Sequence, residues 1–402
     1  MDTLKTLITR AHESTEWGKS ERMGFPVTEP LDVAIKAYEL FLRPNQNHIG
    51  THTRLARKLI SSHKLEYEFI RDLGKTFGDP KVDGYINSGC TEGNITALWI
   101  AREKFSQSKS CLIKCDLTHH SIEKAIKILG IQDVATIKHD QNFKMDISSL
   151  KKTIDSKLSK GCQKFILCLT VGYTLIGTAD DVEKICRLVR EYRRKFKNTD
   201  FFIHIDAAIG GLPYKFCTRE KFDFSLREVS TFVLDFHKMG RVPYSAGVFL
   251  CRKGLQDNIA YNVGYTGSHS DDTLIGSRGG APAAACWAVW KTMKNGGFKR
   301  MFGKCIENKN YFIKRLKSLG NKVKILDYSP INVFGIVFSI PKSEGKLPQA
   351  VENRFRIVSS PIPGESRIGD NELYKIYIMP HLTEIKINNF VNILQDKIFR
   401  ND

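Results

Sequence analysis

The sequence predicts an α/β protein: a large domain built on a mostly parallel sheet, an N-terminal helical arm and a smaller C-terminal α+β domain. Two observations predict this. Through the middle of the chain, short apolar runs alternate with amphipathic stretches, which is typical of β–α units. The chain has 402 residues, more than one minimal core requires, which indicates two domains.

The β–α alternation runs from residue 84 to residue 250. Strands are expected at residues 84–87, 110–114, 164–169, 201–205, 231–234 and 247–250, and helices at 92–104, 121–129 and 180–196. Ligands of such a sheet bind in loops beyond the carboxyl ends of the strands. The residues that carry chemistry are therefore sought in those loops.

After Pro282 the pattern changes. Helices are expected at 283–294, 298–319 and 383–398, and strands at 322–326, 333–339 and 373–378. We accordingly predict an arm over residues 1–50, a large domain over 51–290 and a small domain over 291–402.

The composition and the net charge limit the classes of partner and the cellular compartment to be expected. A net charge of +19 makes nucleic acid the first partner to consider, but the densest basic clusters, at 151–164 and 193–197, are expected to be solvated helix faces. No apolar run reaches the ~18 residues of a membrane span, and the first 22 residues lack a signal-peptide pattern. The ten cysteines show no zinc spacing and are expected to be reduced thiols. We expect a cytoplasmic protein with no metal, no membrane and no nucleic-acid partner.

Two strand ends carry residues suited to a carbonyl cofactor. Lys238 follows the expected strand 231–234, where partial desolvation can make its amine a nucleophile toward a carbonyl. Asp206 ends the strand 201–205, where a carboxylate can pair with a pyridinium nitrogen and keep it protonated. Taken singly, a solvated lysine and a helix-capping aspartate remain open alternatives.

Three turns between strands and helices complete the candidate residues. Gly89, Cys90 and Thr91 lie in a small-residue turn whose backbone N–H groups suit a phosphate, although an ordinary capping turn has the same composition. His119 can stack on a flat aromatic cofactor or cap the helix that follows it. The turn at 276–282 is either a further phosphate contact or a plain loop.

Together these segments resemble the group II pyridoxal-phosphate decarboxylases of the aspartate-aminotransferase (type I) fold, over roughly residues 20–320. Bacterial histidine decarboxylases and archaeal tyrosine/aspartate decarboxylases are the members that this sequence resembles best. The matching stretches are GYINSGCTEGNITALWIARE, THHSIEKAIKILGI, TVGYTLIGTADDVEKI, HIDAAIGGLPYKF, DFHKMG and IGSRGGAPAAACWAVW.

The resemblance implies pyridoxal 5'-phosphate as the cofactor and assigns each site residue a role. Lys238 forms the Schiff base, Asp206 pairs with the pyridine nitrogen and His119 stacks over the ring. The remaining cofactor contacts that it implies are Gly89, Cys90 and Thr91 with His237 at the phosphate, Ala208 under the ring, Thr174, and Gly276 with Ser277 at the phosphate of a neighbouring subunit. It therefore also implies a homodimer with shared active sites.

The implied reaction is decarboxylation of an L-amino acid to the amine and CO₂, through an external aldimine and a quinonoid. Histidine, aromatic amino acids and aspartate remain open as substrates. Tyr265 is the expected proton donor to the carbanion, with Tyr261 and His269 as alternatives on the same loop. The sequence departs from the family pattern at Cys90, Thr170, Tyr173 and Asp235.

Two other functions remain open. The stretch YTGSHSDDTLIGSRGGAPAAACWA also resembles C–C lyases such as sphingosine-phosphate lyase, which would release an aldehyde instead of CO₂. A catalytically inactive, nucleic-acid-binding or regulatory protein on the same fold would account for the charge.

Overall fold

The computed structural model describes residues 19–51, 61–264, 269–340, 346–361 and 372–398, together with residues 3, 5–7 and 10. Its contacts divide the chain into two compact units. The large unit takes in residues 30–300 and 328–331, and the small unit takes in 1–29, 301–327 and 332–402. Residues 30–50 thus group with the large unit. The domain limits predicted at residues 50 and 290 stay predictions.

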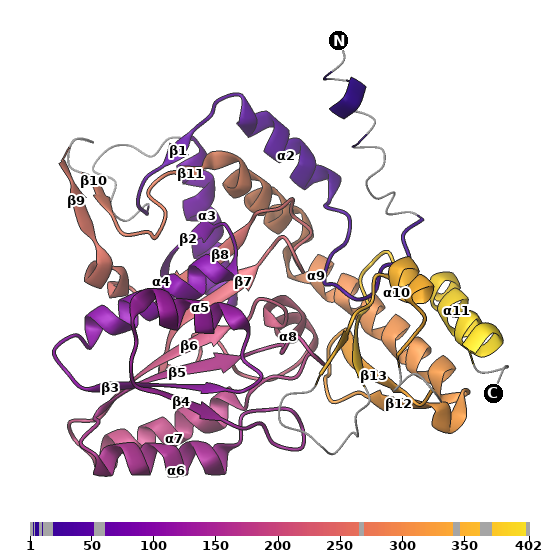
Figure 1. The fold of residues 1–402 in the computed structure, drawn as a ribbon. Coiled ribbons are helices and arrows are strands. Elements are labelled where there is room, and N and C mark those ends of the chain that lie inside the picture. The colour runs from indigo at the N-terminus through magenta and orange to yellow at the C-terminus, as the bar shows by residue number, and fades with distance from the viewer. Residues whose placement is uncertain are drawn as a thin grey trace. The chain divides into compact units, whose positions relative to one another are not determined.

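A seven-stranded sheet forms the centre of the large unit (Figure 1). β8 runs antiparallel to both of its neighbours, β2 and β7, and the other four pairings in the sheet are parallel. β2 consequently runs parallel to β7, so six strands point their carboxyl ends to one edge. In spatial order the strands are β2 (Asp83–Asn87), β8 (Gly247–Cys251), β7 (Val229–Asp235), β6 (Asp200–Asp206), β5 (Lys164–Thr170), β3 (Ser110–Cys115) and β4 (Val134–Ile137).

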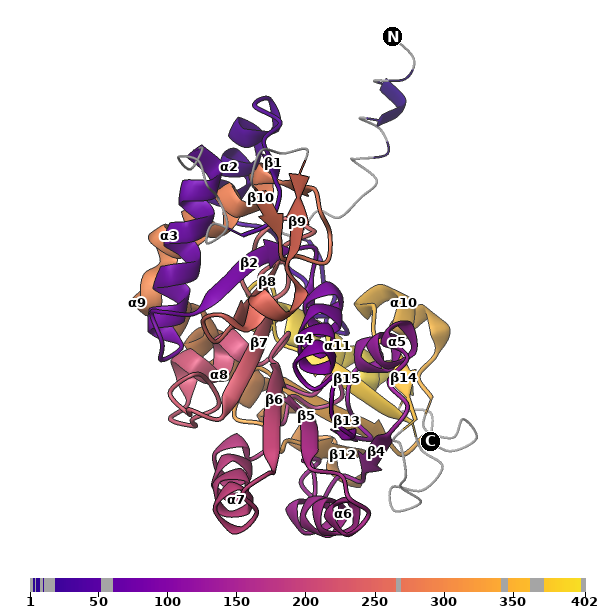
Figure 2. The ribbon, with the colours of Figure 1, turned by 90° about the vertical axis from the view of Figure 1, so that its left-hand side faces the viewer.

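Helices cover both faces of this sheet (Figures 1 and 2). α4 (Cys90–Lys104) and α5 (His120–Leu129) pack on one face in a shared apolar cluster with side chains of β3, β5, β6 and β7. On the other face the α7 ring of Tyr192 lies 6.2 Å from Phe201 of β6. The other helices of the unit are α2 (Asp32–Leu42), α3 (Ser61–Thr76), α6 (Ile147–Ser159), α7 (Val182–Lys195), α8 (Gly211–Cys217) and the first part of α9.

Local sequence signals explain where these elements start and stop. β5 and β6 are apolar and buried along almost their whole length, as expected for central parallel strands with helices on both faces. Asp146 caps α6 by accepting a hydrogen bond from Ser149 N at 2.6 Å. Gly130 ends α5 in the left-handed region, at φ 64°.

The small unit is built on an antiparallel sheet with its own apolar core. Its strands are, in spatial order, β12 (Val323–Leu326), β13 (Val333–Phe338), β15 (Leu373–Tyr377) and β14 (Ser359–Ser360), and its helices include α10 (Gln349–Phe355) and α11 (Glu384–Ile393). The two helices expected after Pro282 form one long helix, α9 (Gly280–Lys317), with a break at Lys294, where φ is 49°.

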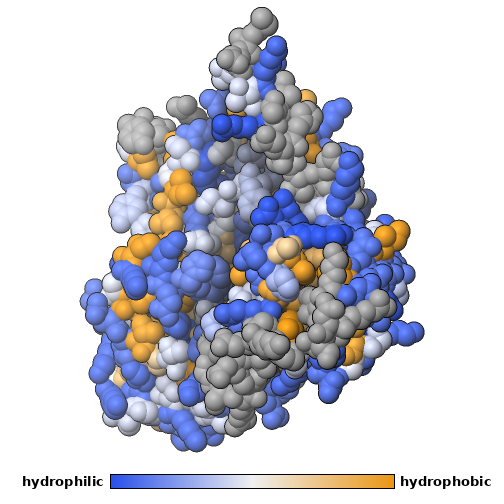
Figure 3. All heavy atoms as spheres, turned by 45° about the vertical axis from the view of Figure 1, so that its right-hand side comes forward, coloured by the Kyte–Doolittle hydropathy of each residue, from blue (hydrophilic) through white to orange (hydrophobic). Residues whose placement is uncertain are grey.

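The structure bears out the predicted α/β class and the order of the predicted elements. The elements that were not predicted include α3, β4, α6, α8 and α10, and the short strands β1 (Asn47–His48), β9 (Tyr261–Val263), β10 (His269–Asp271), β11 (Arg278–Gly279) and β14. All ten cysteines are free thiols, nine of them buried. Within the described part of the chain, no helix is both long and apolar enough for a membrane span, and no cluster of potential metal ligands occurs. The face in Figure 3 mixes polar and apolar side chains.

Candidate active site

A cavity of about 240 Å³ opens at the carboxyl edge of the sheet. The loops that follow β2, β3, β5, β6 and β7 all contribute to its wall, which is where an open α/β sheet binds ligands. The lining residues are Ser88, Gly89, Cys90, Thr91, Leu117, His119, Thr170, Gly172, Tyr173, Thr174, Asp206, Ala208, Ile209, Asp235, His237, Lys238 and Tyr244. Nine of the site residues predicted from the sequence therefore meet in one cavity.

Lys238 enters the cavity from the turn after β7 and is paired there with Asp235. Its Nζ lies 2.6 Å from Asp235 Oδ2. Burial opposes the charge on this lysine, but the carboxylate of Asp235 outweighs burial, so the pKa of Lys238 lies above its ordinary value. His237 accepts a hydrogen bond at Nδ1 from Ala246 N, and burial lowers its pKa, so its ring is neutral at pH 7.

Asp206 is held at the end of β6 by Asn94 of α4. Asn94 Nδ2 donates to Asp206 Oδ2 at 2.9 Å, and the N–H of Ala208 donates to Oδ1 at 3.1 Å. The oxygen of the same amide lies 2.8 Å from His204 Nε2, which must then carry the imidazole proton. Complete burial lowers the pKa of His204 to about 4 and keeps it neutral. Asp206 is therefore fixed in orientation by a neutral network.

His119 belongs to the same network through Ser121. Asn94 Nδ2 also donates to Ser121 Oγ at 2.7 Å, and the Ser121 hydroxyl lies 2.8 Å from His119 Nδ1. Because the N–H of Ser121 also donates to His119 Nδ1, at 3.3 Å, that nitrogen is an acceptor and the hydroxyl proton of Ser121 points to it. Burial lowers the pKa of His119 despite the opposing effect of Asp206. His119 thus presents Nε2, with its proton, to a ligand.

The turn before α4 has the backbone that an anion requires. Gly89 has φ 143°, a conformation that residues with a Cβ rarely adopt, and it places the start of α4 at the cavity. The positive end of the helix dipole lies there, with His237 on the same wall. One donor of this turn is already engaged, since Cys90 N–H donates to Asp235 Oδ1 at 2.7 Å.

The wall formed by the loops after β5 and β6 combines the polar Thr170 and Thr174 with the apolar Ile209 and with Tyr173. The ring of Tyr173 lines it, while the hydroxyl donates to both oxygens of the buried Asp180, at 2.9 Å each. Burial raises the pKa of Asp180 to about 6, although the N–H groups of Met145 and Thr170 donate to it. Gly172 is required here, because a Cβ would collide with the backbone nitrogen of Gly210.

These residues fit pyridoxal 5'-phosphate. Thr170 Oγ1 is buried in the cavity wall and has no hydrogen-bond partner among the described residues, which indicates a polar ligand there. A lysine, an imidazole, an oriented carboxylate and a helix N-terminus are the groups that a pyridine aldehyde phosphate needs.

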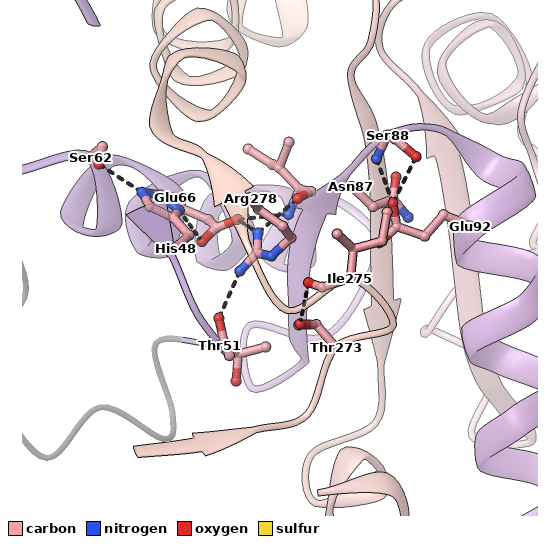
Figure 4. Close-up of polar contacts among 12 residues, drawn as sticks. His48, Thr51, Ser62, Glu66, Asn87, Ser88, Glu92, Thr273, Ile275 and Arg278 are labelled. Carbon is pink, nitrogen blue, oxygen red and sulfur yellow. Dashed lines mark hydrogen bonds and ion pairs between the residues drawn. The ribbon is translucent and has the colours of Figure 1, made fainter. Parts of the chain in front are cut away.

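The remaining predicted residues lie elsewhere. Gly276 and Ser277 do not line this cavity; Ser277 lines a neighbouring hollow with residues of α2 and hydrogen-bonds Asn47. Arg278, directly after them, is bound by Glu66 in a buried network (Figure 4). Tyr265 lies outside the described residues. Tyr261 is exposed, and its ring lies 6.1 Å from that of Trp99.

Sequence reasoning missed the residues that orient the others. Asn94, Ser121 and His204 were not assigned a role, although all three lie inside the stretches that matched the family. The alternation of His204 and Asp206 along one strand is a signal that both face the same side. The pairing of Asn94 with Asp206 has no local signal.

Comparison with known proteins agrees with this geometry. A family described as "Pyridoxal-dependent decarboxylase conserved domain" matches residues 64–340. Tryptophan decarboxylase of Clostridium sporogenes is 27% identical over 96% of this chain and 93% of its own length. A probable L-tyrosine/L-aspartate decarboxylase of Methanosphaerula palustris is 31% identical over 73% of this chain and 76% of its own length. L-methionine decarboxylase from Streptomyces sp. 590 has the same fold, with a TM-score of 0.84 at 17% identity over 98% of this chain and 94% of that one.

Proposed function

This chain belongs to the pyridoxal-dependent decarboxylase family, and from that premise we propose that its cavity decarboxylates an L-amino acid on pyridoxal 5'-phosphate bonded to Lys238. The observation that carries the assignment of residues is the meeting of Lys238, Asp206 and His119 in one cavity, although they come from three separate strand ends. The family match confirms the resemblance seen in the sequence and the cofactor that it implied.

When bound, pyridoxal phosphate supplies the electron sink that takes up the electron pair of the broken Cα–carboxylate bond. Asp206 would accept a hydrogen bond from the protonated pyridine nitrogen and so keep the charge on that nitrogen. Asn94 prevents the carboxylate of Asp206 from rotating, because its amide also bonds His204 and Ser121. The neutral His119, which lines the cavity and holds a proton on Nε2, would stack over the ring.

We assign the phosphate to the turn of Gly89, Cys90 and Thr91, with His237 and Thr174 beside it. The start of α4 supports this assignment, because the backbone N–H groups and the positive end of the helix dipole at this position both favour an anion. Ala208 lies beside Asp206 at the end of β6, where its small side chain leaves room for a ring. Tyr265 remains our proposed proton donor.

The cavity wall favours an aromatic or aliphatic substrate over aspartate. Its apolar surface comes from Leu117, Ile209 and the ring of Tyr173. Among the described lining residues, the lysine is Lys238, whose amine bonds the cofactor. The two histidines, His119 and His237, are neutral because burial lowers their pKa. A side-chain carboxylate therefore finds no free cation in this part of the wall. Tryptophan and tyrosine, named for two relatives, are the first substrates to test.

A homodimer with shared sites is supported by exposed apolar side chains next to the Gly276–Ser277 turn. Leu40 and Leu42 of α2 and Ile275 are all exposed, and Leu42 and Ile275 line the same hollow as Ser277. Apolar groups gathered in this way mark protein–protein contacts. Analytical ultracentrifugation of the wild-type protein should give the mass of a dimer. The double variant Leu42→Asp, Ile275→Asp should sediment as a monomer and bind the cofactor with lower affinity. The cytoplasmic location stays a prediction.

The decisive experiment uses the purified chain. With pyridoxal phosphate it should develop a visible absorption band, and borohydride followed by peptide mass spectrometry should find the cofactor on Lys238. A panel of L-amino acids should then release CO₂, with the amine as co-product. Cofactor trapped elsewhere would refute the assignment of Lys238. An aldehyde in place of CO₂ would indicate the C–C lyase alternative.

A further inference from the structure

Asp235 ends β7 inside the cavity, and both of its carboxylate oxygens are engaged by groups of the chain itself. Oδ1 accepts the N–H of Cys90 at 2.7 Å, and Oδ2 lies 2.6 Å from Lys238 Nζ. His237 Nε2 lies 3.6 Å from the same oxygen. The lysine that must bond the cofactor is thus tied to a buried carboxylate.

This pair opposes the chemistry that Lys238 has to perform. An amine attacks a carbonyl carbon with its lone pair, which an ammonium lacks. A carboxylate within hydrogen-bond distance stabilises the ammonium, and the pKa of Lys238 is indeed raised, even though burial acts in the opposite direction. Burial would raise the pKa of Asp235 as well, but the charge of Lys238 holds it below its ordinary value.

We propose that Asp235 is a positioning residue that holds Lys238 as an ammonium and takes its proton when the phosphorylated cofactor enters the cavity. The proposal rests on the proposed function, because it requires pyridoxal phosphate to bond to Lys238. It assigns Asp235 a role in loading the cofactor.

The proton moves because the cofactor brings negative charge. A phosphate dianion raises the pKa of a nearby carboxyl and also that of a nearby ammonium, so it favours transfer from Lys238 Nζ to Asp235 Oδ2 when it lies nearer to the carboxylate. The turn that we assign to the phosphate contacts Asp235 directly, through Cys90 N–H, and so places the dianion on the side of the carboxylate. The neutral amine nitrogen then bonds to the aldehyde carbon, and the aldehyde oxygen leaves as water with both remaining amine protons. Asp235 keeps its proton and can donate a hydrogen bond to an anion.

The other titratable groups facing the pair do not replace Asp235 in this role. Burial is the main reason why the pKa of Cys90 lies well above its ordinary value and that of His119 lies below its own. The thiol and the imidazole are therefore neutral. Burial also raises the pKa of Tyr244, which keeps its proton. Asp206 adds negative charge but is engaged by Asn94.

The chain offers a matched control. Lys215 Nζ lies 2.6 Å from Asp223 Oδ2, and Asp223 is as buried as Asp235. This second pair belongs to the same unit but does not line the cavity. Asp223→Asn therefore removes the same kind of interaction away from the site.

The experiment measures capture of pyridoxal phosphate by the cofactor-free full chain, by stopped-flow absorbance from about pH 6 to about pH 9. Borohydride trapping confirms that the product is on Lys238. Asp235→Asn should capture the cofactor about tenfold faster at neutral pH, with the rate profile displaced to lower pH, since each unit of lysine pKa is a factor of ten in free amine. Asp223→Asn should match the wild type. The rate of capture of pyridoxal, which lacks the phosphate, should increase more on Asp235→Asn than the rate of capture of pyridoxal phosphate does.

A profile of Asp235→Asn that superposes on the wild type, or slower capture, overturns the proposal. Asp235→Ser serves as the second variant if Asp235→Asn does not fold, with the same expectations. The proposed function fails separately: in that case the wild type itself captures no cofactor on Lys238.

Discussion

In the described part of the large unit, two buried clusters of charged groups are built differently. In the first, Glu66 binds Arg278 Nη1 at 2.7 Å and His48 Nδ1 at 3.0 Å (Figure 4). Arg278 also donates to the carbonyl oxygens of Ile86 and Gly50. In the second, Lys238, Asp235, Asp206 and His119 surround a cavity.

The two clusters therefore have different roles: the first stabilises the fold, and the second is available for chemistry. In the Glu66 cluster both carboxylate oxygens and both terminal guanidinium nitrogens find partners within the chain, although the buried Nε of Arg278 has none among the described residues. This cluster ties the segment before α3 to the turn that precedes α9, so its groups contribute to stability. The cavity cluster is open, because the hydroxyl of Thr170 has no partner within the described structure and the charged groups face free volume. Substitutions should therefore affect stability in the first cluster and turnover in the second.

Lys238→Arg should have the largest effect. Arginine keeps a cation beside Asp235 but cannot bond the cofactor, so turnover should fall by on the order of a thousandfold or more, as for loss of a covalent nucleophile. The free energy of unfolding of the cofactor-free protein should stay close to that of the wild type. Steady-state CO₂ release and urea unfolding measure the two effects. A variant with several per cent of wild-type turnover would contradict the role of Lys238.

The fold was predictable because its signals are local and repeated. Apolar runs such as Phe201–Ile205 and amphipathic stretches such as 180–196 predict a strand and a helix wherever they occur. β4 was missed because it has only four residues, three of which are not fully buried. The break in α9 was predicted as a gap between helices near the two glycines that follow Lys294, and its position follows from that local sequence.

The site was predictable only in part, for a physical reason. Lys238, Asp206 and His119 each end a strand or start a helix, so a parallel sheet brings them to one edge whatever the details of packing. Asn94 and Ser121 depend on how α4 and α5 rotate over that sheet, which no local pattern encodes. The partner of Asp235 was missed similarly: the sequence marked this position as unusual but did not show that its carboxylate binds Lys238.

Glu66→Gln should have the second largest effect, on stability. It leaves Arg278 buried without its counter-charge, which should cost about 3–5 kcal/mol of unfolding free energy. Burial opposes the charge of Glu66, but Arg278 and His48 lower its pKa far below the ordinary value. The stabilisation is therefore complete above the unfolded pKa, near 4.3, and is lost as the pH falls below it.

Urea unfolding of the wild type and Glu66→Gln across this pH range measures that difference. Glu68→Gln on the same helix is the control, because Glu68 bonds Trp287 Nε1 from a partly exposed position. Turnover per folded molecule should change only a few-fold. A stable Glu66→Gln protein with lost turnover would mean that this cluster belongs to the chemistry.

His204 should produce a smaller, pH-dependent effect. Its pKa is lowered by burial to about 4, whereas an unfolded histidine titrates near 6.5. Between these values the unfolded state binds the proton more readily, so stability should fall as the pH falls, by roughly 3 kcal/mol in all. His204→Gln can still donate to Asn94 but does not titrate, so its unfolding free energy should lack this part of the pH dependence. Equal slopes for the two proteins would contradict a neutral, buried His204.

Tyr173 contacts both the cavity and the buried interior, and its substitution should have the smallest effect. Its ring faces the cavity, but its hydroxyl bonds Asp180 in the interior. Tyr173→Phe should lose about 1.5–3 kcal/mol of stability, the contribution of a hydrogen bond to a charged group, without changing the ratio of kcat/KM for aromatic and acidic amino acids. Tyr173→Thr removes the ring and should lower that ratio. If Tyr173→Phe alone alters substrate preference, the hydroxyl acts on the substrate and the wall is not apolar at this position.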